Sequence, residues 1–198
     1  MRKKQKAREW FLMGQLQELL GNNNEAYKAY QHVVRLNPPY ETEFNARISM
    51  TEVLADKQSA KMAGKLRRMA LSDKNKDYKD RIYYALGNIY LLQKDSLKAI
   101  SSYERGRKES TRNGVEKGVL LLKLGDIYWH KEQYDKAKSC YGEAIGLIDK
   151  EREDYPELSK RSTILDKLVP FTNEIALQDS LQALALMPES ARNADIDR

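Results

Sequence analysis

The chain has 198 residues and a net charge of +6, with 41% hydrophobic and 32% charged residues. This composition is typical of a folded, charge-rich helical protein and excludes a disordered chain. Only 10 glycines and 5 prolines interrupt it, which favours helices over a turn-rich β fold. The single cysteine, Cys140, excludes a disulfide framework within the chain and a site of several thiolates. No apolar run approaches the length of a membrane span, and the first residues show no signal-peptide pattern.

One motif occurs three times along the chain. Its members are Trp10-x2-Met13-Gly14, Tyr83-x2-Leu86-Gly87 and Leu121-x2-Leu124-Gly125. Twelve residues after each glycine stands an alanine, and four residues later a tyrosine, at Ala26 and Tyr30, Ala99 and Tyr103, and Ala137 and Tyr141. A glycine inside a helix costs roughly 1 kcal/mol relative to alanine, so it needs a packing reason. The spacing therefore indicates pairs of helices that approach closely at the glycine and the alanine.

We expect the tyrosines to fill the space between one helical pair and the next. The tight turns within the pairs are expected at residues 21–24, 94–95 and 131–133. A longer loop is expected around residues 110–114, because the second and third glycines are slightly further apart than one repeat.

These motifs resemble the tetratricopeptide repeat, which has a period of 34 residues and places a proline where Pro38 stands. The resemblance implies an all-α fold, a right-handed α-solenoid with C-terminal capping helices. We expect about four repeats over residues 7–149. The second of them, between Glu41 and Tyr78, is degenerate because it lacks the glycine.

Residues 150–198 are expected to form a capping helix and the start of a further helical region. Pro156 starts the capping helix, which we expect to end near Pro170. A second, amphipathic helix is predicted from Thr172 to Pro188, followed by another helical start that runs to Arg198.

The first repeat helix is apolar on nearly every face, since it carries Trp10 to Met13 together with Leu16, Leu19 and Leu20. A terminal repeat normally has a polar outer face, and a helix that is apolar all round is normally buried. We therefore expect a further element or a partner to cover it, and we interpret the chain as a part of a longer protein.

Catalytic motifs are missing from the sequence. It has no phosphate-binding glycine loop, no GxSxG elbow and no HExxH, and His32 and His130 stand in different repeats. We therefore expect no enzyme activity, no cofactor and no metal. Lys57, Lys61, Lys65 and Arg68 share one helix face, which we interpret as a solvated face, and no nucleic-acid partner is expected.

In tetratricopeptide arrays the first helix of each pair lines a concave groove that binds proteins. Carried over to this chain, this geometry predicts a protein-binding groove that includes Asn45, Tyr84, Asn88, Asp126 and Trp129. Other groove positions are Phe11, Gln15 and Ser49. Trp129 is open to two interpretations, an exposed anchor for a partner or a core residue under the C-terminal helix.

Two segments show a narrower resemblance. Leu36-Asn37-Pro38-Pro39-Tyr40-Glu41 and Ile175-Ala176-Leu177-Gln178-Asp179-Ser180-Leu181 look like the repeat region of the SprE/PorW lipoproteins of Bacteroidetes. That family supports gliding motility and type IX secretion. The resemblance implies a scaffold at the periplasmic face of the outer membrane, with secretion or motility components of the cell envelope as partners. Membrane attachment would require a missing N-terminal lipid anchor. The alternatives are a repeat-bearing sensor region of a bacterial signalling protein and a cytoplasmic adaptor.

Overall fold

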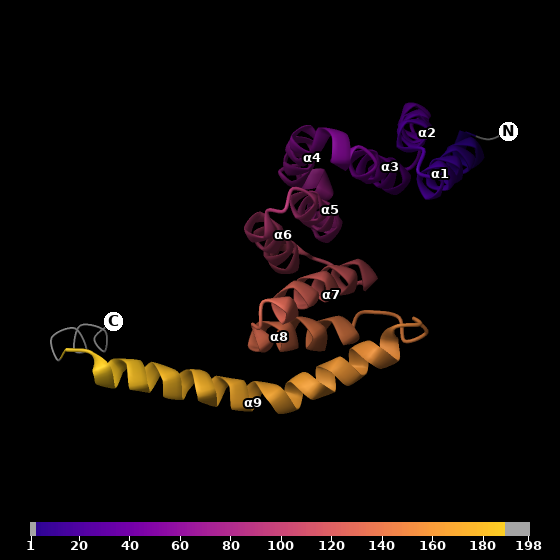
Figure 1. The fold of residues 1–198 in the computed structure, drawn as a ribbon. Coiled ribbons are helices and arrows are strands. Elements are labelled where there is room, and N and C mark those ends of the chain that lie inside the picture. Colours follow the sequence, from indigo (N-terminus) through magenta and orange to yellow (C-terminus); the bar gives the residue numbers. More distant parts are fainter. Residues whose placement is uncertain (1–2, 189–198) are drawn as a thin grey trace. The chain divides into compact units, whose positions relative to one another are not determined.

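The structure is a computed structural model that describes residues 3–188, without the side chains of residues 56 and 57. All elements of the described residues are helical (Figure 1). They are α1 (Lys3–Leu19), α2 (Asn23–Arg35), α3 (Tyr40–Glu52), α4 (Ala55–Ala70), the short 3-10 helix η1 (Asp73–Tyr78), α5 (Lys79–Leu92), α6 (Ser96–Glu109), α7 (Val115–His130), α8 (Tyr134–Ile145) and α9 (Tyr155–Leu186). The chain divides into two compact units, residues 1–120 and 121–198.

The repeated glycines and tyrosines meet inside each helical pair. A β-carbon at Gly14 would lie 2.5 Å from Cε1 of Tyr30, and one at Gly87 would overlap the ring of Tyr103. The expectation that the tyrosines lie between successive pairs was therefore correct only in part, since Tyr30 and Tyr141 also contact the helix that follows their pair. Each ring fills the space that the glycine leaves on the partner helix of the same pair, since its position on the second helix faces the first.

The hydroxyl of each repeated tyrosine donates a hydrogen bond back to the first helix of its pair. The acceptors are Glu18 for Tyr30 (2.9 Å), Asn88 for Tyr103 (2.7 Å) and Asp126 for Tyr141 (2.5 Å). All three rings are fully buried, and burial of the phenol raises the pKa of each. A buried hydroxyl without a hydrogen-bond partner would destabilise the fold, so these bonds satisfy the hydroxyls that the packing removes from water.

The turns within the pairs share one backbone geometry. Gly21, Lys94 and Glu132 have positive φ angles of 74°, 59° and 58°. After each of them, a backbone N–H reaches back five residues to a helical carbonyl, as in Asp95 N to Tyr90 O at 2.9 Å. This is the Schellman ending of a helix, which normally places glycine in the left-handed position. Only the first of the three turns has that glycine.

Residues 40–78 fold into two helices and η1 although the repeated glycine is lost. Phe44 on α3 and Met62 and Leu66 on α4 are almost completely buried. Tyr78 packs on Phe44 with ring centroids 4.5 Å apart. This segment therefore keeps the helical packing expected of it. Its assignment as a degenerate repeat stays a prediction.

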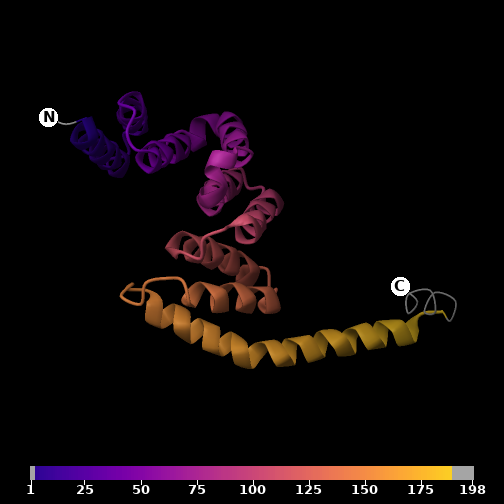
Figure 2. The ribbon, with the colours of Figure 1, turned by 180° about the vertical axis from the view of Figure 1, so that it is seen from behind.

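The C-terminal helix is longer than predicted. A single helix, α9, runs through Pro170 to Leu186, so the expected end near Pro170 was wrong. Leu158, Leu165 and Val169 are buried, and Lys138 of α8 pairs with Asp166 at 3.1 Å. Figures 1 and 2 show α8 lying along the first half of α9, and α9 bends between its two ends. The proline is tolerated because such a bend moves its ring away from the preceding turn.

Beyond Pro170 the side chains of α9 are mostly exposed. Phe171, Ile175 and Leu177 are 68%, 61% and 57% exposed. The helical start predicted after Pro188 lies outside the described residues.

The first helix also has an uncovered apolar face. Leu12, Leu16 and Leu19 are 56%, 47% and 85% exposed, whereas Ala7 and Gly14 on the opposite side are buried against α2. The expectation that a further element or a partner covers this face stays a prediction.

Candidate protein-binding groove

The unit of residues 1–120 contains a cavity of about 470 Å³ between α1, α3, α5 and the beginning of α7. We call it the N-terminal groove. Its apolar lining consists of Phe11, Ile48, Tyr84, Val115 and Val119. Its polar lining consists of Gln15, Asn45, Ser49, Glu52, Arg81 and Glu116. Apolar walls with a few placed polar groups are typical of binding sites.

The spacing along α3 explains why this helix contributes most to the groove. Asn45, Ile48, Ser49 and Glu52 follow one another at three- and four-residue steps, which places them on one face. Phe44 and Ala46 precede and follow Asn45 in the sequence, so they flank this face, and both are buried in the core. The same helix therefore contributes to the core and to the groove.

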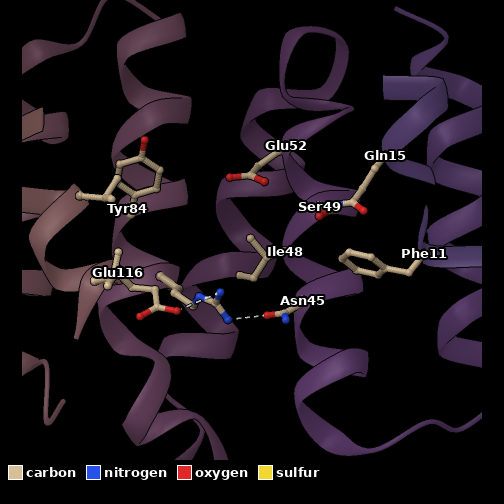
Figure 3. A pocket seen from close by; sticks show the side chains of 11 residues that line it. Phe11, Gln15, Asn45, Ile48, Ser49, Glu52, Tyr84 and Glu116 are labelled. Atoms are coloured by element: carbon tan, nitrogen blue, oxygen red, sulfur yellow. Dashed lines mark hydrogen bonds and ion pairs between the residues drawn. The ribbon is translucent and has the colours of Figure 1, made fainter. Parts of the chain in front are cut away.

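An ordered polar network crosses the groove. The guanidinium of Arg81 donates a hydrogen bond to Oδ1 of Asn45 at 2.6 Å and forms an ion pair with Glu116 at 3.2 Å (Figure 3). These contacts join α3, α5 and α7, which are distant in the sequence. They also fix the direction of the guanidinium.

Besides Arg81 and Glu116, the lining contains a third charged residue, Glu52, which ends α3. Burial raises the pKa of its carboxyl to about 7, with a further contribution from the negative charge of Glu18, while Arg81 opposes the shift. Near neutral pH this carboxyl therefore exchanges between its neutral and charged forms.

The sequence-predicted residues Asn45 and Tyr84 both line the N-terminal groove, as do Phe11, Gln15 and Ser49. Asn88 follows one turn after Tyr84 on α5, but its side-chain oxygen accepts the hydrogen bond from Tyr103. Part of its polar surface is therefore engaged in holding α6.

Asp126 and Trp129 lie in the unit of residues 121–198. Asp126 accepts hydrogen bonds from Tyr141 and from Arg161 of α9, the latter at 3.1 Å. The guanidinium of Arg161 also lies 5.7 Å from the ring centroid of Trp129, and Tyr134 meets this ring edge-on. Both residues thus contact Arg161 of the C-terminal helix, and Trp129 is half-buried, so both interpretations of Trp129 stay open. Their role in partner binding stays a prediction.

Sequence reasoning missed Glu52, Arg81 and Glu116 as groove residues. Glu52 could have been found, because it stands seven residues after Asn45 and therefore on the same helix face. Arg81 stands three residues before Tyr84 and could have been found in the same way. Glu116 lies in the first turn of α7, which follows a loop, and no periodic pattern placed it here.

The part of the chain that the structure describes contains no group of three or more His, Cys, Asp or Glu side chains able to hold a metal ion. Within residues 3–188, no helix combines the length and the apolar character needed to cross a membrane. Cys140 is buried in α8, beside Gly125. Of the basic face on α4, Lys61 and Arg68 are exposed and Lys65 lies 6.0 Å from the ring of Tyr27.

A family model of the tetratricopeptide repeat matches residues 7–40, 80–106 and 120–150. Over the described residues the fold is all-α, and the three matched stretches carry tetratricopeptide repeats, which is consistent with an α-solenoid. Repeats of this kind indicate a protein–protein interaction scaffold, and the match indicates no enzymatic family.

Among solved structures, the chain is similar to a crystal structure of MamA protein, at 16% identity and a TM-score of 0.47. The similarity covers 92% of this chain and 97% of that chain. No curated protein matches the sequence significantly.

Proposed function

We propose that this chain is a non-catalytic scaffold whose N-terminal groove binds a segment of a partner protein. The observation that supports this most directly is the cavity of about 470 Å³ formed by α1, α3, α5 and α7. It joins an accessible aromatic, Tyr84, to the Asn45–Arg81–Glu116 network. An aromatic anchor beside oriented polar groups is suited to a peptide, since the ring supplies contact area and the polar groups set direction.

Photo-crosslinking tests this proposal. A benzoyl-phenylalanine at Val119 in the groove should cross-link a partner in cells that produce the full chain, whereas one at the exposed Lys61 on α4 should not. Tyr84→Ala should reduce the cross-linked product at least tenfold, because a central aromatic is worth about 2 kcal/mol or more at an interface.

Tyr27→Ala is the matched control, since Tyr27 is a half-buried tyrosine of α2 that does not line the groove. Equal cross-linking from Val119 and Lys61, or equal loss with both tyrosine variants, would contradict the groove as the binding surface. Circular dichroism of each variant verifies that its helices are retained.

We further propose that the partners are secretion or motility components of the cell envelope. The support for this is the resemblance of residues 36–41 and 175–181 to the SprE/PorW lipoproteins. The proposed place is the periplasmic face of the outer membrane, with attachment through a lipid anchor upstream of the present sequence. The expected result of cell fractionation is recovery with the envelope, and mass spectrometry of the cross-linked product should identify an envelope protein. Recovery in the cytosol with a cytosolic partner would replace this proposal by the adaptor alternative.

A further inference from the structure

Glu52 lies on the floor of the N-terminal groove without an ion-pair partner. Figure 3 shows its carboxylate pointing into the cavity, with no interaction drawn to another lining residue. Among the described residues, no hydrogen bond or ion pair to its side chain is found, although the charges of Glu18 and Arg81 act on it. Glu52 is thus the carboxylate in the groove that has no cation of its own, whereas Glu116 is neutralised by Arg81.

The surroundings of Glu52 disfavour its negative charge in the free chain. The residue ends α3, where the carbonyl ends of the helix are already partially negative, and the last turn of that helix has no basic residue. The charged and titratable groups that face it are Glu18 on α1, Tyr30 on α2 and Arg81 on α5. A half-buried carboxyl in such a place contributes nothing favourable to folding.

Arg81 favours the charged form of Glu52 through its positive charge but makes no ion pair with it, because its guanidinium contacts Asn45 and Glu116. One amino group donates to Asn45 at 2.6 Å and the other pairs with Glu116 at 3.2 Å. Among the side chains that the structure describes, the charged form of Glu52 therefore has no directly paired cation.

We propose that Glu52 receives a lysine or arginine side chain from the bound segment, so that the N-terminal groove selects a partner with a basic residue at one fixed position. This inference rests on the proposed function of the groove. A long basic side chain fits the chemistry of the site, because Phe11, Ile48 and Tyr84 offer apolar contact to its methylene groups. Its charged end supplies the hydrogen bonds that the carboxylate lacks.

Proton exchange accompanies this recognition. Because the pKa of the Glu52 carboxyl is raised to about 7, a bound cation must shift this group toward its charged form. By linkage, binding of a basic side chain releases a proton and strengthens as the pH rises from about 6 to about 8. Tyr30 stays protonated throughout, since its pKa is raised further above its ordinary value.

A peptide selection on the full chain tests the proposal. A library of random twelve-residue peptides is selected for binding, and only binders that weaken on Tyr84→Ala are kept as groove ligands. Each such peptide is then synthesised with norleucine in place of each basic residue in turn. Norleucine is neutral and of similar length. At the position that contacts Glu52, it should weaken binding to the wild-type chain roughly tenfold to hundredfold, the effect expected for the loss of a charged hydrogen bond.

Glu52→Gln is the decisive variant, because the amide keeps the shape of the side chain and removes its charge. It should bind the norleucine peptide as well as the wild-type chain does, and it should show no penalty for norleucine. Glu18→Gln is the control for an unspecific charge effect and should keep most of the preference for the basic residue. The preference of the wild-type chain should also weaken about tenfold between pH 8 and pH 6.

Four results would overturn the inference. If groove ligands carry no basic residue at a common position, or if Glu52→Gln keeps the full norleucine penalty, the subsite is wrong while the proposed function stands. If no peptide depends on Tyr84, neither the groove nor its subsite binds a peptide. If Glu18→Gln removes the preference as completely as Glu52→Gln, the effect is the general charge of the groove.

Discussion

The ring of Tyr103 lies against the α-carbon of Gly87, so that a β-carbon at residue 87 would overlap the ring. This contact sets the distance between α5 and α6. Gly14 and Tyr30 make the same contact between α1 and α2. The repeated glycine is thus required by the ring that covers it.

Gly87→Ala should lower the free energy of unfolding by about 1–3 kcal/mol, because the buried ring has to move to admit the methyl group. Gly64→Ala is the matched control. Gly64 lies in α4, and a β-carbon there would meet nothing within 4 Å. That substitution should raise stability by about 0.5–1 kcal/mol through the higher helix propensity of alanine. Urea denaturation followed by circular dichroism compares the two, and equal effects would refute the contact as the reason for the glycine.

Tyr141→Phe should lower stability by about 1.5–3 kcal/mol, the usual range for a hydrogen bond to a charged group. The phenol donates to the carboxylate of Asp126 at 2.5 Å and accepts from the guanidinium of Arg161 at 3.1 Å. Tyr134→Phe provides the comparison, since its hydroxyl makes no hydrogen bond to another described residue. Hydrogen exchange of α8 and α9 should increase only in the Tyr141 variant. Equal exchange in both variants would show that the hydroxyl is dispensable.

Two turn residues hold an unfavourable backbone conformation. Lys94 and Glu132 have φ angles of 59° and 58°, where glycine is normally found. Lys94→Gly and Glu132→Gly should each raise stability by up to about 1 kcal/mol, since glycine enters this region without steric conflict. Gln93→Gly is the control. Gln93 is one residue earlier and has a φ angle of −78°, where glycine brings no relief of strain, so this substitution should lower the stability. Thermal unfolding distinguishes them, and a loss of stability on Lys94→Gly would contradict the turn geometry.

Glu52 predicts a specific pH dependence of stability. Its pKa is raised from 4.5 to about 7 in the folded chain, so the folded state binds more protons between these values than the unfolded state. Stability contributed by this group therefore falls as the pH rises from about 4.5 to about 7, by about 1–3 kcal/mol in total. The buried Asp80, whose pKa burial also raises, adds to the same trend.

The difference in unfolding free energy between the wild-type chain and Glu52→Gln gives the contribution of Glu52 alone, because Asp80 contributes equally to both chains. The variant should be the more stable chain at pH 8, and the advantage should disappear below about pH 5. Carbon-13 NMR of the carboxyl gives its pKa directly. A value below 4.5 would mean that Arg81 pairs with Glu52 in the free chain and would contradict the unmatched charge.

Pro170 offers a test of the bent C-terminal helix. It lies inside α9, where its ring replaces a backbone donor. Pro170→Ala should raise stability by about 1–3 kcal/mol and increase the helical signal. Pro156→Ala at the beginning of the same helix should have little effect, since proline is tolerated in the first turn. A loss of helix in the Pro170 variant would show that the bend itself is needed for packing on α8.

Much of the helical packing could be predicted from the sequence because its signals are local. The glycine, alanine and tyrosine recur at fixed intervals, and each interval places a side chain on a defined helix face. Groove positions such as Asn45 and Tyr84 followed from the same rule. The end of the helix near Pro170 was predicted wrongly, because a proline lowers the local helix preference without deciding whether packing on a neighbouring helix restores it.

The sequence by itself determined the class of this protein. In a helical repeat the residues that contact one another recur at fixed intervals along the sequence, so the pattern can be recognised without the structure. Only the tertiary structure decided which side chains share one cavity and which of them are paired. Arg81 reaches Asn45 and Glu116, and no described cation pairs with Glu52, because α3, α5 and α7 converge there from distant parts of the sequence. Electrostatic matching depends on distances between side chains, and those distances exist only once the helices have packed.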